Sequence, residues 1–212
     1  MQRSNIEHPF LGKYLNEQVS SEVIVDLDGL DNFQGSTSIT GHGYMLYDGD
    51  HRKEYAACLI ETFNIPQIRI EPGKWRQRMR LKFVFEDLPQ EENYVKFNPD
   101  KPDKPETIFA GNSEYALKAM DRLPSLLPDL LAPLPIEKIH PPHGLSITEA
   151  HILGTTVMGD DPETSIVDKH LVHHQLRNLL VLGGGVFPTS SPSNPTLTIS
   201  ALSLWAAHHL LN

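Results

Sequence analysis

The sequence predicts an α+β fold, an antiparallel sheet with helices on one face, and three observations support this. Apolar and polar residues alternate through much of residues 21–88, including 21–29 and 36–49, as expected for half-buried strands. Helical spacing of apolar residues follows at 112–124 and again at 194–211. Strands grouped before helices favour an α+β arrangement over an alternating parallel one.

The clearest alternation lies within residues 67–88. Pro72-Gly73 separates two alternating runs, which predicts a hairpin with its turn at that pair. Four basic residues share one face of the second run: Arg76, Arg78, Arg80 and Lys82. A solvated face of an antiparallel sheet is the favoured interpretation of these side chains, and a site for an anionic substrate is the alternative. Residues 93–97 predict one further short strand.

The first helix should be capped by Asn112 or Ser113, because both residue types accept hydrogen bonds from the first helical N–H groups. One face of this helix is apolar and comprises Ala116, Ala119, Met120 and Leu123. Pro124 predicts the end of the helix, since proline lacks an N–H group and disfavours helical geometry in the residue before it.

The C-terminal stretch combines a strand, a glycine turn and a second helix. The apolar run 179–182 ends in three glycines, which predicts a buried strand followed by a turn that a ligand can approach. Asn194 and Pro195 predict the N-cap and first position of the helix. Its apolar residues predict a well-buried helix: Leu197, Ala201, Leu202, Leu204, Trp205, Leu210 and Leu211.

Composition limits the classes of function. The 212 residues carry a net charge of -9 at pH 7, which opposes non-specific binding to nucleic acid or anionic membrane. No apolar run reaches the length of about 18 residues that a membrane-spanning helix requires. A single cysteine excludes an internal disulfide and a thiolate metal site. We therefore expect a soluble protein without a targeting signal in this chain, cytoplasmic or periplasmic, that does not bind nucleic acid.

Residues 178–202 resemble the C-terminal signature of the glucose-methanol-choline (GMC) flavin oxidoreductases. The matching positions are Asn178, Leu179, Val181, Phe187-Pro188-Thr189, Asn194-Pro195-Thr196-Leu197-Thr198-Ile199 and Ala201-Leu202. The Gly183-Gly184-Gly185 variant is most similar to that of the sugar and sugar-acid dehydrogenases in this family. A second match, H-x-x-G-T followed by M-G and V-D, is formed by His151, Gly154-Thr155, Met158-Gly159 and Val167-Asp168.

The resemblance implies an FAD-dependent enzyme that oxidises a CH–OH group of a sugar, sugar acid or other alcohol by hydride transfer to flavin. It assigns residues 1–20 to the exit from a flavin domain and residues 21–150 to a substrate-binding domain. Residues 151–212 would then supply the catalytic residues and the strand and helix that return to the flavin domain.

The same resemblance implies the site residues. His151 would be the base that accepts the hydroxyl proton, and Asn194 would orient the reacting oxygen. Asn194 could equally be a plain helix cap, or both, and the sequence leaves these alternatives open. Cofactor contacts would come from Gly183, Gly184, Asn194, Pro195 and Thr196. The positive end of the second helix would stabilise negative charge on a reduced flavin.

The dinucleotide-binding unit, a strand followed by G-x-G-x-x-G and a helix, is missing from the sequence. Three explanations compete: a fragment of a flavoenzyme, which we favour, one half of a split enzyme with a separate flavin-domain chain, or a non-catalytic sugar-binding module. The 11 histidines include no H-E-x-x-H or related spacing, so we expect no metal site.

Overall fold

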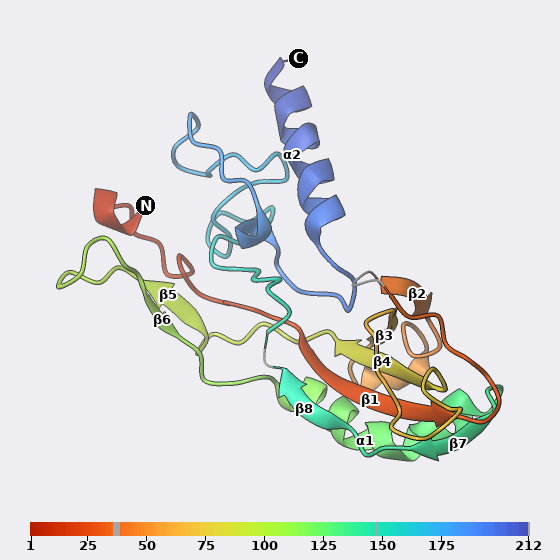
Figure 1. Cartoon of the computed structure of the whole chain (residues 1–212). Helices are drawn as coiled ribbons and strands as arrows, with labels where there is room; N and C mark the ends of the chain where they lie inside the picture. Colours follow the sequence, from red (N-terminus) through yellow and green to blue (C-terminus); the bar gives the residue numbers. More distant parts are fainter. Residues whose placement is uncertain (36–38, 147, 212) are drawn as a thin grey trace. The chain divides into compact units, whose positions relative to one another are not determined.

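The computed structural model describes residues 1–35, 39–146 and 148–211, except for the side chain of Thr40. Residues 36–38 of the predicted strand 36–49 lie outside this set. The chain forms two compact units (Figure 1). Unit 1 comprises Met1–Gln18, Asp87–Ser113 and Thr148–Asn212, and unit 2 comprises Val19–Glu86 and Glu114–Ile147. The predicted domain boundaries at residues 20 and 150 remain predictions.

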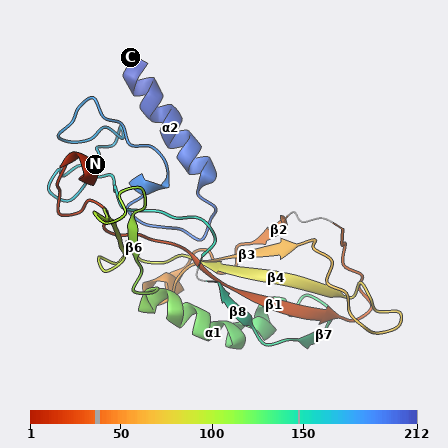
Figure 2. The same cartoon turned by 60° about the vertical axis from the view of Figure 1, so that its left-hand side comes forward.

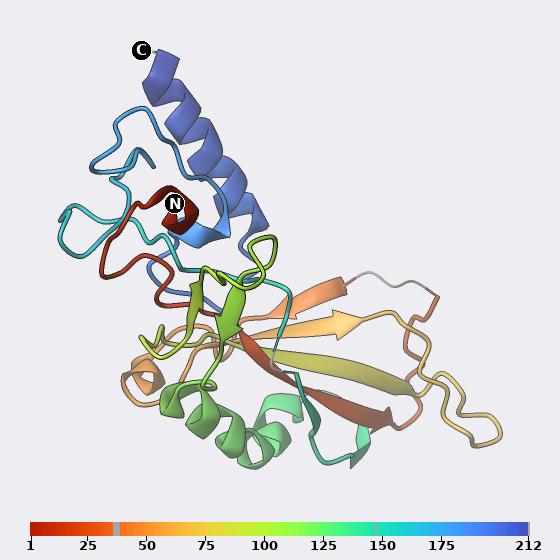
Figure 3. The same cartoon turned by 90° about the vertical axis from the view of Figure 1, so that its left-hand side faces the viewer.

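Unit 2 contains an antiparallel sheet, as the alternation predicted. Its strands are β1 (Val19–Leu27), β2 (Ile39–Gly43), β3 (Cys58–Phe63), β4 (Arg78–Phe85), β7 (Ile136–Ile139) and β8 (His143–Ser146). They lie in the order β2-β3-β4-β1-β7, with β8 also paired to β1 (Figure 3). A short 3₁₀ helix, Asp50–Lys53, precedes β3.

One face of this sheet is covered by helix α1 (Glu114–Leu131), as Figure 2 shows. Alternate residues of β1, such as Val23, lie opposite apolar residues of β4, such as Leu81, and both are buried. The helix contributes Leu123 and Leu127, each at most 2% exposed, to the same core. The predicted α+β class, with a helix on one face of an antiparallel sheet, is therefore confirmed.

Helix α1 continues past Pro124 and ends at Leu131, so the predicted end at Pro124 is wrong. Pro124 and Pro128 both lie on the exposed side of the helix, where water can solvate the carbonyl groups that lose an N–H partner. Leu127 and Leu131 on the opposite side are buried against the sheet. Burial of these leucines outweighs the local cost of the two prolines.

The predicted hairpin within residues 67–88 forms only in part. The turn is present, with Gly73 at φ +80°, and the second run is β4. Residues 67–70 do not join the sheet, because β4 is already paired on both edges, with β1 and with β3. Ile70 is consequently 96% exposed.

The basic residues of β4 are balanced by carboxylates of β1. Arg78 binds Asp26, with 2.6 Å between Nε and Oδ1, and Arg80 is bonded to Glu22. Burial raises the pKa of Asp26, but its bonds to Arg78 and His140 outweigh this and lower the pKa to about 2. Half-buried ion pairs thus replace the freely solvated face that we predicted. These arginines are not free for an anionic substrate.

Unit 1 contains little regular structure. Its elements are the 3₁₀ helices η1 (Gln2–Ser4) and η3 (Gly184–Val186), strands β5 (Tyr94–Lys96) and β6 (Glu106–Ile108), and helix α2 (Thr196–Leu211). Strand β5 confirms the short strand predicted at 93–97. A small second core gathers Ile166, Val167, Leu171, Val186 and Ala206.

The C-terminal elements of unit 1 differ from two predictions. Residues 179–182 form an isolated bridge, between Leu180 and Val172, instead of a regular buried strand, because no described strand pairs along their length. Helix α2 forms, but the prediction that it is well buried is wrong. Leu197 is 82% exposed and Leu204 is 73% exposed, since no described residues pack over this side of the helix.

Candidate active site

A paired segment fixes the backbone around His151. Asn16 and Leu153 exchange two backbone hydrogen bonds, each 2.9 Å long. Gly154 has φ +84°, and a Cβ atom on it would lie 1.9 Å from the carbonyl oxygen of Tyr14. A residue with a side chain cannot occupy this position without moving the backbone of residue 14. This explains why a glycine follows His151 in the H-x-x-G-T segment.

The carboxylate of Glu17 holds the turn that leads to His151. Its Oε2 atom accepts bonds from Thr148 Oγ1 at 2.8 Å and from the His151 backbone nitrogen at 3.1 Å. Glu17 is only 7% exposed. Ala150, immediately before His151, has φ +60°, an unfavourable conformation that these bonds help to maintain.

Gln18 connects the two segments that carry the predicted catalytic residues. Its Oε1 atom lies 2.7 Å from His151 Nδ1. Its Nε2 atom donates to the carbonyl oxygens of Ser191, at 2.5 Å, and Ser193, at 3.0 Å. Because Ser193 immediately precedes Asn194, the structure brings the segments of His151 and Asn194 together on one buried amide.

Asn194 is exposed and does not cap helix α2. The Ile199 nitrogen donates to the Pro195 carbonyl at 2.9 Å, so the helix begins one residue later than predicted, with Pro195 as the capping residue. Within the described part of the chain, the Asn194 side chain makes no hydrogen bond. Of its two predicted roles, the helix cap is therefore not observed, and the side chain is available to a ligand.

The three consecutive glycines have different surroundings. Cβ atoms on Gly184 and Gly185 would lie 2.5 Å from the Ile152 carbonyl oxygen and 2.7 Å from Thr156 Oγ1. These two glycines allow close packing on the segment after His151. Gly183 has φ +100° and no heavy atom within 4 Å of its Cβ position. Only Gly183 therefore presents an open surface that a cofactor could approach.

Val167-Asp168 is the V-D pair of the family motif, and Asp168 holds the loop that contacts α2. Asp168 Oδ1 accepts bonds from the backbone nitrogens of His170 and Val172, and Oδ2 binds Arg177 at 2.9 Å. Burial raises the pKa of Asp168, but these bonds outweigh it, so the pKa lies below its ordinary value. The Lys169 carbonyl in turn accepts a bond from Trp205, which anchors α2 on this loop.

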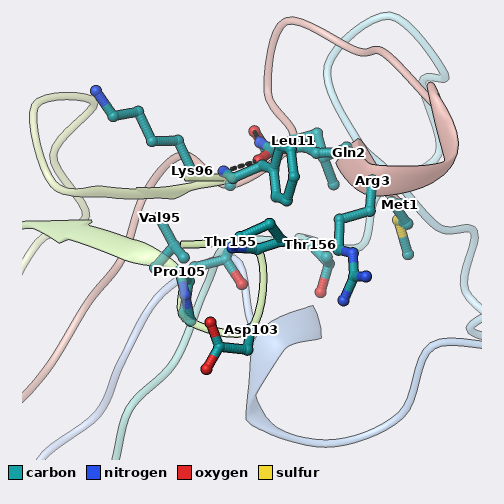
Figure 4. Close-up of a pocket in the computed structure, with 13 residues that line it drawn as sticks. Met1, Gln2, Arg3, Leu11, Val95, Lys96, Asp103, Pro105, Thr155 and Thr156 are labelled. Atoms are coloured by element: carbon teal, nitrogen blue, oxygen red, sulfur yellow. Dashed lines mark hydrogen bonds between the residues drawn. The ribbon is translucent and has the colours of Figure 1, made fainter. Parts of the chain in front are cut away.

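Unit 1 also contains a cavity of about 410 Å³, shown in Figure 4. It is lined by the first residues of the chain, Leu11-Gly12, strand β5, the loop between β5 and β6, and Thr155-Thr156. Its charged side chains are Arg3, Lys96 and Asp103. Neither His151 nor Asn194 lines this cavity, so it is not the predicted catalytic site.

The residues present fit one edge of a flavin site. Gly183 leaves open space, Asn194 is exposed, and the first turn of α2, beginning at Thr196, is accessible. The leading N–H groups of a helix lack intrahelical partners and carry partial positive charge, which suits an electron-rich ring edge. Among the residues described, no three His, Cys, Asp or Glu side chains converge as metal ligands. No described helix has the length and apolar character needed to cross a bilayer.

Comparison with known proteins identifies the class. The family model described as GMC oxidoreductase matches residues 89–203, which is more than half of the chain, and the chain belongs to this family. GMC oxidoreductases depend on FAD.

The chain is also similar to individual proteins of known function and structure. Over 62 residues the chain is 48% identical to the fructose dehydrogenase large subunit of Gluconobacter japonicus, covering 29% of this chain and 11% of that protein. Over 57 residues it is 39% identical to the gluconate 2-dehydrogenase flavoprotein of Pantoea cypripedii, covering 27% and 9%. Pyridoxine 4-oxidase from Mesorbium loti shares the fold, with a TM-score of 0.64 and 17% identity over 95% of this chain and 44% of that one. The chain thus spans less than half of each.

Sequence reasoning missed two residues of this site, Glu17 and Gln18. The resemblance to GMC proteins assigned residues 1–20 to the exit from a flavin domain, but it gave no role to any single residue there. Both side chains are polar and nearly fully buried, 7% and 1% exposed, which only the folded chain reveals. Their adjacency to His151 depends on the pairing of residue 16 with residue 153, far away in sequence.

Proposed function

We propose that this chain carries the catalytic residues of an FAD-dependent oxidoreductase that oxidises a CH–OH group of a small-molecule alcohol. Membership of the GMC family supports the reaction class. The observation that carries the proposal is the joining of the His151 and Asn194 segments through Gln18 in one compact unit.

A bound flavin would supply the acceptor for the hydride that leaves the carbinol carbon. His151 accepts the proton of the substrate hydroxyl as the carbon–oxygen bond gains double-bond character. Asn194, whose amide has no other partner in the described chain, donates a hydrogen bond that orients the same oxygen. Glu17 and Gln18 keep the backbone and ring of His151 in place.

We also propose which residues contact the cofactor. Gly183, Asn194, Pro195 and Thr196 would contact the flavin, and Gly184 would hold the turn against Ile152. In this assignment residues 1–20 and 151–212 belong to the flavin side and residues 21–150 to the substrate side.

For the substrate we propose a sugar or sugar acid, because two relatives are a fructose dehydrogenase and a gluconate 2-dehydrogenase. We further propose that a flavin-binding part, in the same polypeptide or in a separate chain, covers the apolar side of α2. Exposure of Leu197, Leu204 and Trp205 supports this, because contiguous apolar surface of this kind usually marks an interface.

The test begins with visible absorbance after the chain is incubated with FAD and desalted. We expect little retained flavin from the chain alone and a bound-flavin spectrum once the flavin-binding region of a relative is supplied. That complex should reduce a dye acceptor in the presence of a sugar. Sugar binding without any flavin uptake, even with the flavin-binding region supplied, would support the non-catalytic sugar-binding module instead.

The role of His151 is tested in that flavin-loaded complex. His151→Ala should lower turnover by about 10²-fold or more, because a positioned general base is lost. The spectrum of bound flavin should persist. His51→Ala is the matched control: its ring is bonded to the Leu46 carbonyl in a loop of unit 2, and turnover should change little. Near-normal turnover of His151→Ala would remove this residue from its proposed role.

A further inference from the structure

We propose that Gln18 is a positioning residue that determines which ring nitrogen of His151 carries the proton. It places the proton on Nδ1 and leaves Nε2 as the free base. This inference rests on the proposed function for its catalytic meaning, but the tautomer itself is a property of the chain alone.

The orientation of the Gln18 amide follows from its partners. One end of the amide faces two backbone carbonyl oxygens, those of Ser191 and Ser193, and a carbonyl oxygen can only accept hydrogen bonds. The NH₂ group must therefore occupy that end, since an amide oxygen there would meet two other acceptors. The amide oxygen is left facing His151 Nδ1 at 2.7 Å.

The tautomer of His151 follows from the orientation of the amide. An amide oxygen accepts but cannot donate, so a hydrogen bond at this distance requires a proton on Nδ1. In a neutral imidazole only one nitrogen carries a proton, and Nε2 is then an acceptor. An acceptor at Nε2 is what the removal of a hydroxyl proton requires.

Burial of Gln18 makes the flipped orientation of its amide energetically costly. Gln18 is 1% exposed, so bulk water could not compensate for a flipped Gln18 amide. The backbone on both sides is also fixed, since Glu17 accepts bonds from the Gln18 nitrogen at 2.9 Å and from the His151 nitrogen at 3.1 Å. These bonds keep the backbone of both residues in place, so that the amide and the ring stay within hydrogen-bonding distance.

The same amide couples the base to the other proposed catalytic residue. Two of its bonds end on carbonyl groups in the three residues before Asn194, so a change at residue 18 should disturb the Asn194 loop as well as the ring. If Gln18 only filled space, it would not determine which nitrogen of His151 carries the proton. The tautomer of His151 therefore shows whether Gln18 positions the ring or only packs beside it.

The experiment is ¹⁵N NMR of the histidine ring nitrogens in the 212-residue chain, without flavin, at a pH where His151 is neutral. The His151 signals, assigned by their loss in His151→Ala, should show Nδ1 protonated and Nε2 unprotonated. Gln18→Leu should abolish this preference and populate the Nε2–H form. Gln18→Glu, which keeps an oxygen acceptor on Nδ1, should retain the Nδ1–H form. Folding of each variant is checked by its amide spectrum.

Gln34→Leu is the matched control, because the Gln34 amide also donates to two backbone carbonyls, those of Gln67 and Arg78, but in unit 2. It should leave the His151 ring signals unchanged. An Nε2–H tautomer in the unmodified chain, or an unchanged tautomer in folded Gln18→Leu, would overturn the inference. These outcomes are independent of turnover, so an Nδ1–H tautomer together with an active His151→Ala complex would reject the proposed base and leave the positioning role intact.

Discussion

The two units of this chain are stabilised in different ways. Unit 2 has an antiparallel sheet of long strands, in which β1 and β4 pair over eight positions and α1 packs on the apolar face. Unit 1 has one two-stranded ribbon, several isolated bridges and a small apolar core. Partly buried hydrogen bonds to the side chains of Glu17, Gln18 and Asp168 connect its segments. The catalytic residues that we propose lie in the unit without a large core.

The two helices sharpen this difference. Helix α1 has 18 residues and buries five of them, whereas α2 has 16 residues and buries only Ala206. The more apolar helix is therefore the more exposed one. Apolar character in a sequence predicts that a face is buried against something, but not that the partner lies in the same stretch of chain.

The largest effect should follow from Gly154→Ala in unit 1. The new Cβ atom would lie 1.9 Å from the Tyr14 carbonyl oxygen at φ +84°, and strain plus overpacking should destabilise unit 1 by about 4 kcal/mol. Gly73→Ala in unit 2 has a similar φ, +80°, but open space, so it should cost only about 1–2 kcal/mol. Amide hydrogen exchange, read separately for each unit, measures both. Equal effects would show that the close contact is not limiting.

The next largest loss of stability should come from α1, and a leucine substitution in each helix tests this. Leu123→Ala removes a fully buried side chain from the α1 core and should destabilise unit 2 by about 3 kcal/mol. Leu204→Ala in α2, where the side chain is 73% exposed, should change stability by less than about 0.5 kcal/mol. Hydrogen exchange of each unit again provides the measurement. A large loss from Leu204→Ala would mean that α2 is covered in the isolated chain.

A smaller, pH-dependent effect should come from Asp26 in unit 2. Its folded pKa of about 2 lies below the ordinary value of 3.8, so its stabilising contribution is present above pH 3.8 and is lost as the pH falls toward 2. The contribution is at most about 2 kcal/mol. Asp26→Asn should remove this part of the acid sensitivity in denaturant titrations between pH 2 and 5. Asp31→Asn, at a half-exposed carboxylate 4.0 Å from Arg76, should not.

The smallest effect on stability should come from Asn194→Ala. Because Asn194 makes no capping bond, the substitution should change the free energy of unfolding by less than about 0.5 kcal/mol, compared with the loss of about 1 kcal/mol expected of a true cap. In the flavin-loaded complex it should nevertheless lower turnover. Thermal unfolding and dye reduction test the two statements separately, and a stability loss near 1 kcal/mol would restore the capping role.

Local sequence patterns were sufficient to predict several strands, the start of one helix and the family. The alternation in residues 21–29 and 78–88 predicted strands of an antiparallel sheet, and β1 and β4 confirm this. Residues 112–123 predicted the start and apolar face of α1. The motifs around His151 and Asn194 predicted the GMC family, which the match over residues 89–203 confirms. Such features depend on neighbours within a few positions, so the sequence alone contains them.

Tertiary structure decided the rest. Residues 67–70 could not join the sheet because β4 was paired on both edges, and α1 passed two prolines because its leucines pack on that sheet. Glu17 and Gln18 became part of the site only through pairing of residues 16 and 153. Sequence by itself determined β1, β4, the start of α1 and the family, and it predicted His151 and Asn194 as site residues. Only the folded chain decided which polar groups surround them, because contacts between distant residues depend on packing that no local pattern encodes.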